Sequence, residues 1–324
     1  MMKEMKWARI LLIGVFSLGF FGITVAQDIN AAIGTYNSAL TTMKSDPATA
    51  ITSLKLCIEL CDKIGASADS IKTVANAKFA ETYFNLATKQ AGSKDFTGAA
   101  ETFKQAIQYG EQTNNTEVLK RSSAALSQVY YMQADGYRTQ KDLVKAQEAM
   151  NLSLGIDSTS SRAWIVQTYI YRDSSETEGF EKAIEKVNQY AKNVNESKMA
   201  NSAGLKYFLS IGSQAVNSSK FEEGVPALEK CLKFDEANKD VFYYLAKGYN
   251  GLKLWDKAIE TADKGIAVEE DVPEKEAKFW FEVGIAYAGK ADKTKACESF
   301  KKAQFGQFAE NAKYEIEVTL KCGK

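Results

Sequence analysis

The sequence predicts an all-α protein built as a solenoid of stacked helical hairpins, on three observations. Only 3 of the 324 residues are proline, against about sixteen expected from average usage, and proline breaks helix interiors. Small and bulky apolar residues recur at offsets of 3, 4 and 7, which share one helical face. The same set recurs six times, and one hairpin cannot bury its own apolar face, so the units must stack.

The first 26 residues have the pattern of a bacterial secretory signal peptide. Three basic residues precede residue 10, and an apolar run covers residues 10–26. Thr24-Val25-Ala26 is an acceptable cleavage tripeptide, which places the cut before Gln27. The alternative is an uncleaved anchor, because 17 apolar residues lie at the lower edge of a membrane span. We therefore expect a periplasmic or secreted protein, which contacts a membrane only if residues 10–26 remain attached.

Charge and composition exclude several classes of function. The chain has 41 basic and 41 acidic residues, and loss of residues 1–26 leaves a net charge of −2, so no basic nucleic-acid-binding surface is expected. With no histidine, Ser-His-Asp catalysis, imidazole bases and histidine-bound metals are excluded. The sequence contains no Gly-rich phosphate loop, nucleophile elbow or metal cluster. We expect neither an enzyme nor a cofactor.

The second helix of each unit is marked by a small residue, a bulky one four later, and another, usually small, three after that. The leading small residues are separated by 47, 37, 41, 34 and 38 residues, as expected for one unit with loops of variable length. They are Ala99, Ala146, Ala183, Gly224, Ala258 and Ala296.

The first helix of each unit is marked by an aromatic residue, followed four positions later by a small residue, or by Thr168 in the third unit. The six aromatic residues are Tyr83, Tyr130, Trp164, Phe208, Phe242 and Trp280. Small residues on the facing stripes let the paired helices approach closely, and the aromatic rings fill the space beside them.

The pattern resembles the tetratricopeptide repeat, a unit of two helices in 34 residues. The best-matching stretch, residues 239–267, holds Phe242, Ala246, Tyr249, Trp255 and Ala258 in register. The proline that usually closes each unit is absent almost throughout. The resemblance implies a right-handed α–α superhelical solenoid that acts as a protein- or peptide-binding scaffold of the bacterial envelope.

On this basis the chain divides into four parts. Residues 1–26 form the signal peptide, 27–77 a degenerate hairpin, 78–305 six repeats, and 306–324 a capping helix and tail. Solenoids need such a cap for solubility. Its predicted buried face carries Phe308, Ala312, Ile316 and Leu320.

In tetratricopeptide families the first helices line the concave surface, so the resemblance also implies a partner-binding groove. Its apolar and basic side chains suit an extended peptide or short helix with acidic and apolar side chains. The expected groove residues are Phe84, Tyr131, Arg138, Arg162, Ile165, Tyr169, Arg172, Lys206, Leu209, Tyr243, Lys247 and Phe281.

Alternatives stay open for these residues and for the function. The aromatic side chains could simply pack against the neighbouring unit, and the basic cluster could be a solvated face. A membrane-tethered assembly component and a glycan-binding solenoid are the alternative functions, since exposed Tyr and Trp can stack on sugars.

Two of the five cysteines could form a disulfide. If the chain folds back about residue 306, position 297 faces roughly 315, and Cys322 overshoots Cys297 by about 10 Å along the helix. A disulfide needs Cα atoms within about 7 Å, so the end of the cap must bend inward for a bridge. The sequence is compatible both with a Cys297–Cys322 disulfide and with two free thiols. Cys57 and Cys231 are expected to be buried as small apolar residues.

Overall fold

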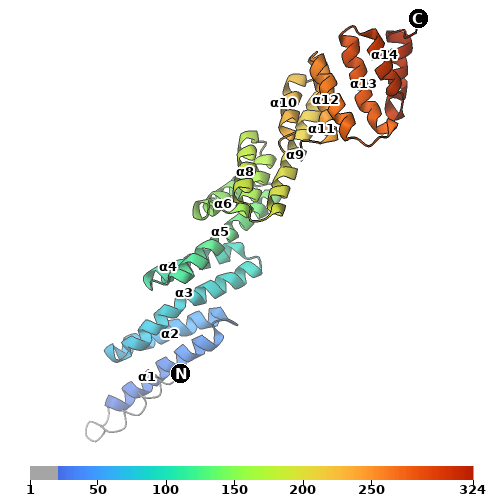
Figure 1. Ribbon diagram of the computed structural model, residues 1–324. Helices are drawn as coiled ribbons and strands as arrows, with labels where there is room; N and C mark the ends of the chain where they lie inside the picture. The colour runs from blue at the N-terminus through green and yellow to red at the C-terminus, as the bar shows by residue number, and fades with distance from the viewer. Residues whose placement is uncertain (1–20, 324) are drawn as a thin grey trace. The chain divides into compact units, whose positions relative to one another are not determined.

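The computed structural model describes residues 21–323, and within this range every regular element is helical (Figure 1). The all-α prediction of sequential helical hairpins is confirmed. The predicted signal peptide lies largely outside the described residues, and its last part, from residue 21, falls in α1 (Phe21–Thr42). No helix of the described range is long and apolar enough to cross a membrane.

The chain forms two compact units, Met1–Ser174 and Ser175–Lys324, each with its own hairpins. In the first unit α1 pairs with α2, α3 with α4, and α5 with α6, while α7 packs on α5 and α6. The first helices also contact one another, α1 with α3, α3 with α5, and α5 with α7. After α1, the elements are α2 (Pro47–Ile64), α3 (Asp69–Gly92), α4 (Phe96–Gln112), α5 (Thr116–Thr139), α6 (Leu143–Ile156) and α7 (Ser161–Asp173).

The second unit repeats this scheme. Here α8 packs on α9, and the hairpins are α9–α10, α11–α12 and α13–α14, with α11 contacting both α9 and α13. The elements are α8 (Thr177–Tyr190), α9 (Val194–Asn217), α10 (Phe221–Cys231), α11 (Lys239–Gly251), α12 (Trp255–Val268), α13 (Pro273–Gly289), α14 (Lys293–Lys302) and α15 (Ala309–Tyr314). The predicted boundary at residue 77 falls inside α3, and the boundary between the units falls between α7 and α8.

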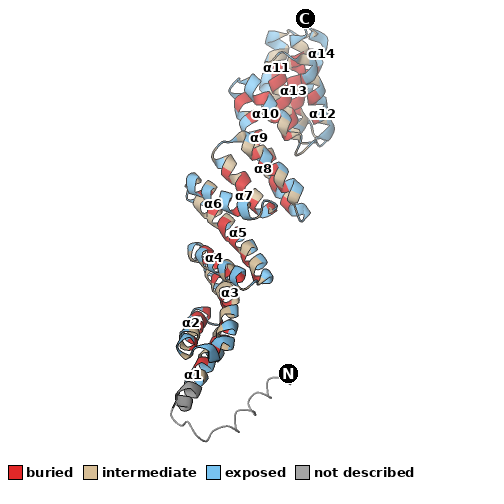
Figure 2. Ribbon diagram, turned by 90° about the vertical axis from the view of Figure 1, so that its left-hand side faces the viewer, coloured by how far each residue is buried: buried red, intermediate tan, exposed pale blue. Residues whose placement is uncertain are grey.

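The repeated small residues lie where the helices touch. All six leading residues of the second helices are buried, from Ala99 to Ala296. Figure 2 shows buried stretches, in red, in the helices of both units. A Cβ at Gly284 of α13 would lie 2.7 Å from the Phe300 ring of α14, and one at Gly265 would lie 2.1 Å from Phe279. Only glycine fits at such distances, so the helices approach as the spacing predicts. The bulky partners, including Phe103 and Phe300, are almost fully buried, and each contributes about 1.5–3 kcal/mol by leaving water.

The turns inside five of the hairpins share one backbone geometry, which the α1–α2 turn lacks. In each of the five, one non-glycine residue takes a left-handed φ between 59° and 65° directly before the N-cap of the second helix: Lys94, Lys141, Ser219, Lys253 and Ala291. In three of these turns the N-cap is an aspartate whose carboxylate accepts a backbone N–H, as Asp95 does from Gly98. These caps satisfy amides that the first helical turn leaves unpaired.

The C-terminal segment packs against the last hairpin. Ala312 is fully buried, and Ile316 and Leu320 pack on Phe300 and its neighbours, as the predicted face requires. The helix continues as a π-helical turn, η4 (Glu315–Thr319), and then ends.

The chain reverses at this point. Lys321 takes a left-handed φ of 52°, as residues that end helices often do. The Cys322 N–H donates to the Ile316 carbonyl, six residues back, at 2.8 Å. The reversal brings Cys322 to Cys297 of α14, and the two form a disulfide with a Cα–Cα distance of 5.9 Å. The inward bend that a bridge requires is therefore made by this helix end.

Candidate functional site

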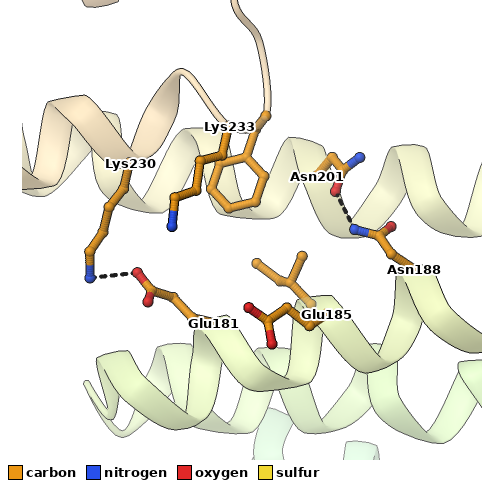
Figure 3. A pocket seen from close by; sticks show the side chains of 8 residues that line it. Glu181, Glu185, Asn188, Asn201, Lys230 and Lys233 are labelled. Carbon is orange, nitrogen blue, oxygen red and sulfur yellow. Dashed lines mark hydrogen bonds and ion pairs between the residues drawn. The ribbon is translucent and has the colours of Figure 1, made fainter.

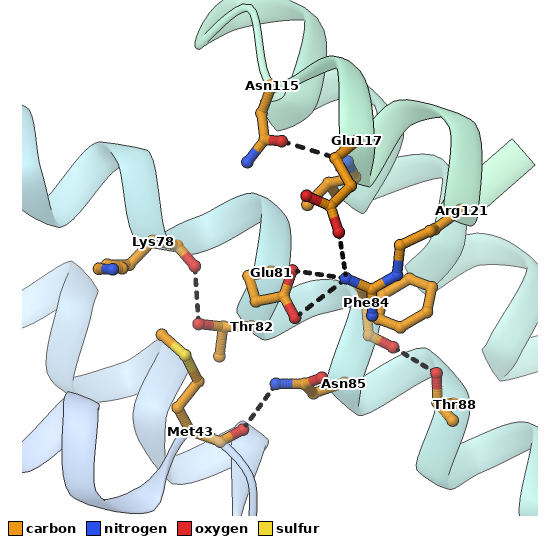
Figure 4. Close-up of polar contacts among 11 residues, drawn as sticks. Met43, Lys78, Glu81, Thr82, Phe84, Asn85, Thr88, Asn115, Glu117 and Arg121 are labelled. Carbon is orange, nitrogen blue, oxygen red and sulfur yellow. Dashed lines mark hydrogen bonds and ion pairs between the residues drawn. The ribbon is translucent and has the colours of Figure 1, made fainter.

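The first helices of the first unit carry seven of the expected groove residues. Phe84 of α3 packs edge-on against Phe103, with ring centroids 5.7 Å apart. The other side of Phe84 is covered by Arg121, whose guanidinium carbon lies 4.2 Å from the ring centroid. Arg121 is held there by Glu81 and Glu117, both within 4.0 Å of its Nη1 atom (Figure 4). A partner would meet the Arg121 guanidinium before the Phe84 ring.

The expected basic cluster of this unit is paired with acids. Arg138 of α5 contacts Asp135 at 2.8 Å and Asp173 at 3.0 Å, and Arg172 of α7 contacts Asp173 at 2.7 Å. Two arginines and two aspartates leave no net charge. Burial lowers the pKa of the Arg138 guanidinium, but its bonds to both aspartates outweigh that effect and raise the pKa. The side chain of Arg138 is only 17% exposed, so its position is set by α5 and α7 together.

Tyr169 of α7 lies close to both arginines. The guanidinium carbons of Arg138 and Arg172 are 5.4 Å and 5.1 Å from its ring centroid, which is cation–π distance. A cavity of about 460 Å³ adjoins this cluster and is lined by Arg138, Thr139, Lys141, Leu143 and Asp173. The α5–α7 surface thus combines an aromatic ring, fixed guanidinium groups and an open hollow.

The remaining expected residues of the first unit differ in exposure. Tyr131 is half-buried against the α5–α6–α7 core. Ile165 is 9% exposed and offers almost no surface to a partner. Arg162 is exposed at the start of α7.

In the second unit, the expected aromatic residues are covered by the chain itself. The centroid of the Phe308 ring lies 6.3 Å from that of Tyr243 and 5.5 Å from that of Phe281. The sequence predicts Phe308 on the same face of the capping helix as Ile316. Phe281 also packs edge-on against Phe300, at 5.4 Å. Burial raises the pKa of Tyr243 to about 12. The aromatic row of α11 and α13 is thus a packing surface here.

The other expected residues of this unit remain more accessible. Lys206 of α9 is exposed, and Leu209 is half-buried. Lys247 of α11 is half-buried and donates to the Asn217 Oδ1 atom at 2.8 Å.

A buried acid lies beside the covered row. Glu282 of α13 is 3% exposed, and burial raises its pKa to about 7, while the hydrogen bond from Asn250 and the charge of Lys247 oppose the increase. The Asn250 amide donates both to the Glu282 carboxylate and to its backbone carbonyl, each at 2.9 Å. Sequence reasoning missed this residue, although Glu282 is the only charged residue among the six positions two after the first-helix aromatics.

Within residues 21–323 no group of three or more Cys, Asp or Glu side chains is arranged to hold a metal. The three free thiols, Cys57, Cys61 and Cys231, are buried, and burial raises the pKa of Cys61 to about 11 and of Cys231 to about 12. Thiols held protonated in this way are poor nucleophiles.

Comparison with known proteins gives structural neighbours only, since neither a family model nor a curated protein matches the sequence. Among solved structures, MamA is 21% identical, with 59% of this chain and 94% of that chain covered and a TM-score of 0.35. YrrB, described as a TPR protein with an unusual peptide-binding site, is 17% identical, with 66% of this chain and 98% of that chain covered and a TM-score of 0.35. A tetratricopeptide repeat protein from Parabacteroides merdae is 16% identical, with 90% of this chain and 99% of that chain covered and a TM-score of 0.29. These identities and TM-scores are too low to transfer a function.

Proposed function

We propose that this chain is a non-enzymatic scaffold that binds a protein or an extended peptide. The observation that carries the proposal is the α5–α7 surface, where Arg138 and Arg172 both lie at cation–π distance from Tyr169 and Arg138 lines an open cavity. Tyrosine and arginine are the residue types that carry most binding energy in protein interfaces. Arg138 is already held by two aspartates, so little side-chain entropy is lost when a partner docks.

The pairing of charges refines the expected partner. Because Asp135 and Asp173 compensate the two arginines, a strongly acidic peptide gains little net attraction at this surface. We propose instead a peptide with an apolar or aromatic side chain that enters the cavity and packs on Leu143. A second such side chain packs on the nearby Tyr169 ring, and the peptide's backbone carbonyls accept from the guanidinium groups.

The test is peptide selection against the purified protein, followed by affinity measurement on variants. A selected peptide should bind Tyr169→Ala and Arg172→Ala at least tenfold more weakly than the unchanged protein. Tyr314→Ala is the matched control, because Tyr314 is 58% exposed and lies on the C-terminal segment. Equal affinity for all four proteins would place binding elsewhere and contradict the proposal.

We also propose that the protein acts outside the bacterial cytoplasm. The basic and apolar pattern of residues 1–26 supports export, and the Cys297–Cys322 disulfide fits an oxidising compartment. The mature N-terminal residue, determined on protein from the native cell, is expected to be Gln27. An intact N-terminus would instead indicate a membrane-tethered protein.

A further inference from the structure

The second unit contains a cavity that is separate from its covered aromatic row. It has a volume of about 200 Å³ and lies among α8, α9 and the end of α10. Four charged side chains line it: Glu181 and Glu185 from α8, Lys230 from α10, and Lys233 just after α10 (Figure 3). Both signs of charge therefore face the same small space.

The apolar wall of the cavity is closely packed. Phe234 is stacked on Phe208, with centroids 6.1 Å apart and planes at 8°. It also lies against Gly204 of α9, where a Cβ would be 2.7 Å from the ring, so any larger residue would displace it. Ile184 completes this wall and is 2% exposed. A ligand would meet a surface that is formed before it arrives.

The four charges are not equivalent. Lys230 forms an ion pair with Glu181 and lies 5.1 Å from the Phe208 ring centroid, so these two charges satisfy each other. Glu185 and Lys233 are exposed, and no ion pair engages either of them among the described residues. One carboxylate and one ammonium group are thus left to act on a ligand.

The amide side chains close another part of the cavity. Asn188 of α8 donates to the Asn201 Oδ1 atom of α9 at 2.9 Å, and both residues line the space (Figure 3). This bond ties α8 to α9, and the remaining amide positions offer a donor and an acceptor.

We propose that this cavity binds a small zwitterion of the α-amino-acid class with an apolar side chain. The ligand ammonium pairs with Glu185, its carboxylate pairs with Lys233, and its side chain packs on Ile184 and Phe234. Bonds between ionised partners are the stronger hydrogen bonds of proteins. A ligand with a single charge would form only one of these two ion pairs, and a cavity of about 200 Å³ suits a small ligand. The proposal is independent of the α5–α7 surface.

The first test uses the full chain with L-leucine and L-phenylalanine, followed by NMR or calorimetric titration. At least one of the two should bind saturably, and the matching N-acetyl amino acid and amino-acid amide should each bind at least tenfold more weakly. The N-acetyl amino acid lacks the ammonium charge and resembles the C-terminal residue of a peptide. The amide lacks the carboxylate charge and resembles the N-terminal residue. Absence of saturable binding by both amino acids, or equal binding of the derivatives, would overturn the proposal.

The second test uses variants of the two unpaired charges. Glu185→Gln and Lys233→Gln should each weaken binding of the amino acid at least tenfold. The matched controls are Glu178→Gln, whose carboxylate pairs with Lys182 on the same helix, and Lys186→Gln, which contacts Gln189. All four changes lie at half-buried or exposed positions, so circular dichroism should show unchanged folding. If Glu185→Gln and Lys233→Gln bind as the controls do, the assignment is wrong.

Discussion

The two compact units use the same hairpin but complete their first-helix faces in different ways. In the first unit, Tyr169 lies close to two arginines that are neutralised by Asp135 and Asp173, and Arg138 and Asp173 line an open cavity. In the second unit, Tyr243 and Phe281 pack against Phe308, which comes from outside the repeats. The repeat signature therefore controls the contacts between helices. The surface is controlled by residues between the signature positions and by the segment that follows the last repeat.

The units also differ in how they hold acidic groups. Asp135 and Asp173 are matched by arginines at hydrogen-bonding distance. Among the described residues, the Glu282 carboxylate accepts a hydrogen bond only from the Asn250 amide, and burial raises its pKa to about 7. Strongly raised pKa values are costly to stability and often mark sites of function.

The largest effect is expected from removal of the disulfide. Cys322→Ser opens a bridge between residues 25 apart, which should lower the free energy of unfolding of the last hairpins by about 3 kcal/mol. The loss should be confined to the second unit, because repeat units are stabilised by their neighbours. Amide hydrogen exchange should therefore accelerate over residues 293–322, which include Phe308, and stay unchanged over residues 96–139.

A control separates the bridge from the thiol itself. Cys231→Ser changes a free, buried thiol of the same unit and should leave exchange over residues 309–322 unchanged. Equal acceleration in both units after Cys322→Ser would contradict the picture of a locally acting bridge.

The second largest effect is expected at Glu282. Burial makes the folded protein hold a proton that the unfolded chain releases, so stability falls as pH rises from about 4.5 to about 7 and stays low above that. Glu282→Gln keeps an acceptor for Asn250 but carries no charge. It should therefore raise the free energy of unfolding at pH 8 by on the order of 2–3 kcal/mol, with the gain absent at pH 4.5.

Thermal unfolding at both pH values measures this effect. Glu274→Gln, at an exposed position in the first turn of the same helix, is the control and should change stability little at either pH. A gain for Glu282→Gln that is the same at pH 4.5 and pH 8 would show that titration of this group is not its cause.

The smallest effect is expected in the hairpin turns, which the two units share. Lys94→Gly in the first unit and Ala291→Gly in the second relieve a left-handed φ of 65° and 61°. Each should raise the free energy of unfolding by about 0.5 kcal/mol, since the steric cost that glycine removes exceeds the unfolded-state entropy that it adds. Urea titrations of the two variants should show similar gains, whereas Gln105→Gly within α4 should cost about 1 kcal/mol. A gain in only one unit would show that the turns are not equivalent.

The sequence by itself determined the helices, their pairing and their contact residues. Offsets of 3, 4 and 7 depend only on the geometry of the helix, so spacing alone was enough to place Ala99, Phe103 and Gly284 at interfaces. The same local logic predicted Ala312, Ile316 and Leu320 on the packing face of the C-terminal segment. For Cys297 and Cys322, helix geometry showed that a disulfide requires the end of the capping helix to bend inward.

Only the tertiary structure decided what the surfaces present. The pairing of Arg138 with Asp173 joins residues on α5 and α7, and Phe308 reaches Tyr243 from more than sixty positions along the chain. Periodicity within one helix carries no information about such contacts, because they depend on how successive helices are placed in space. The same holds for the pKa of Glu282, which follows from burial by several helices. Contacts between neighbouring helices could thus be predicted from residue spacing. Which charged side chains form ion pairs, and which aromatic rings are packed against other side chains, could be known only from the tertiary structure.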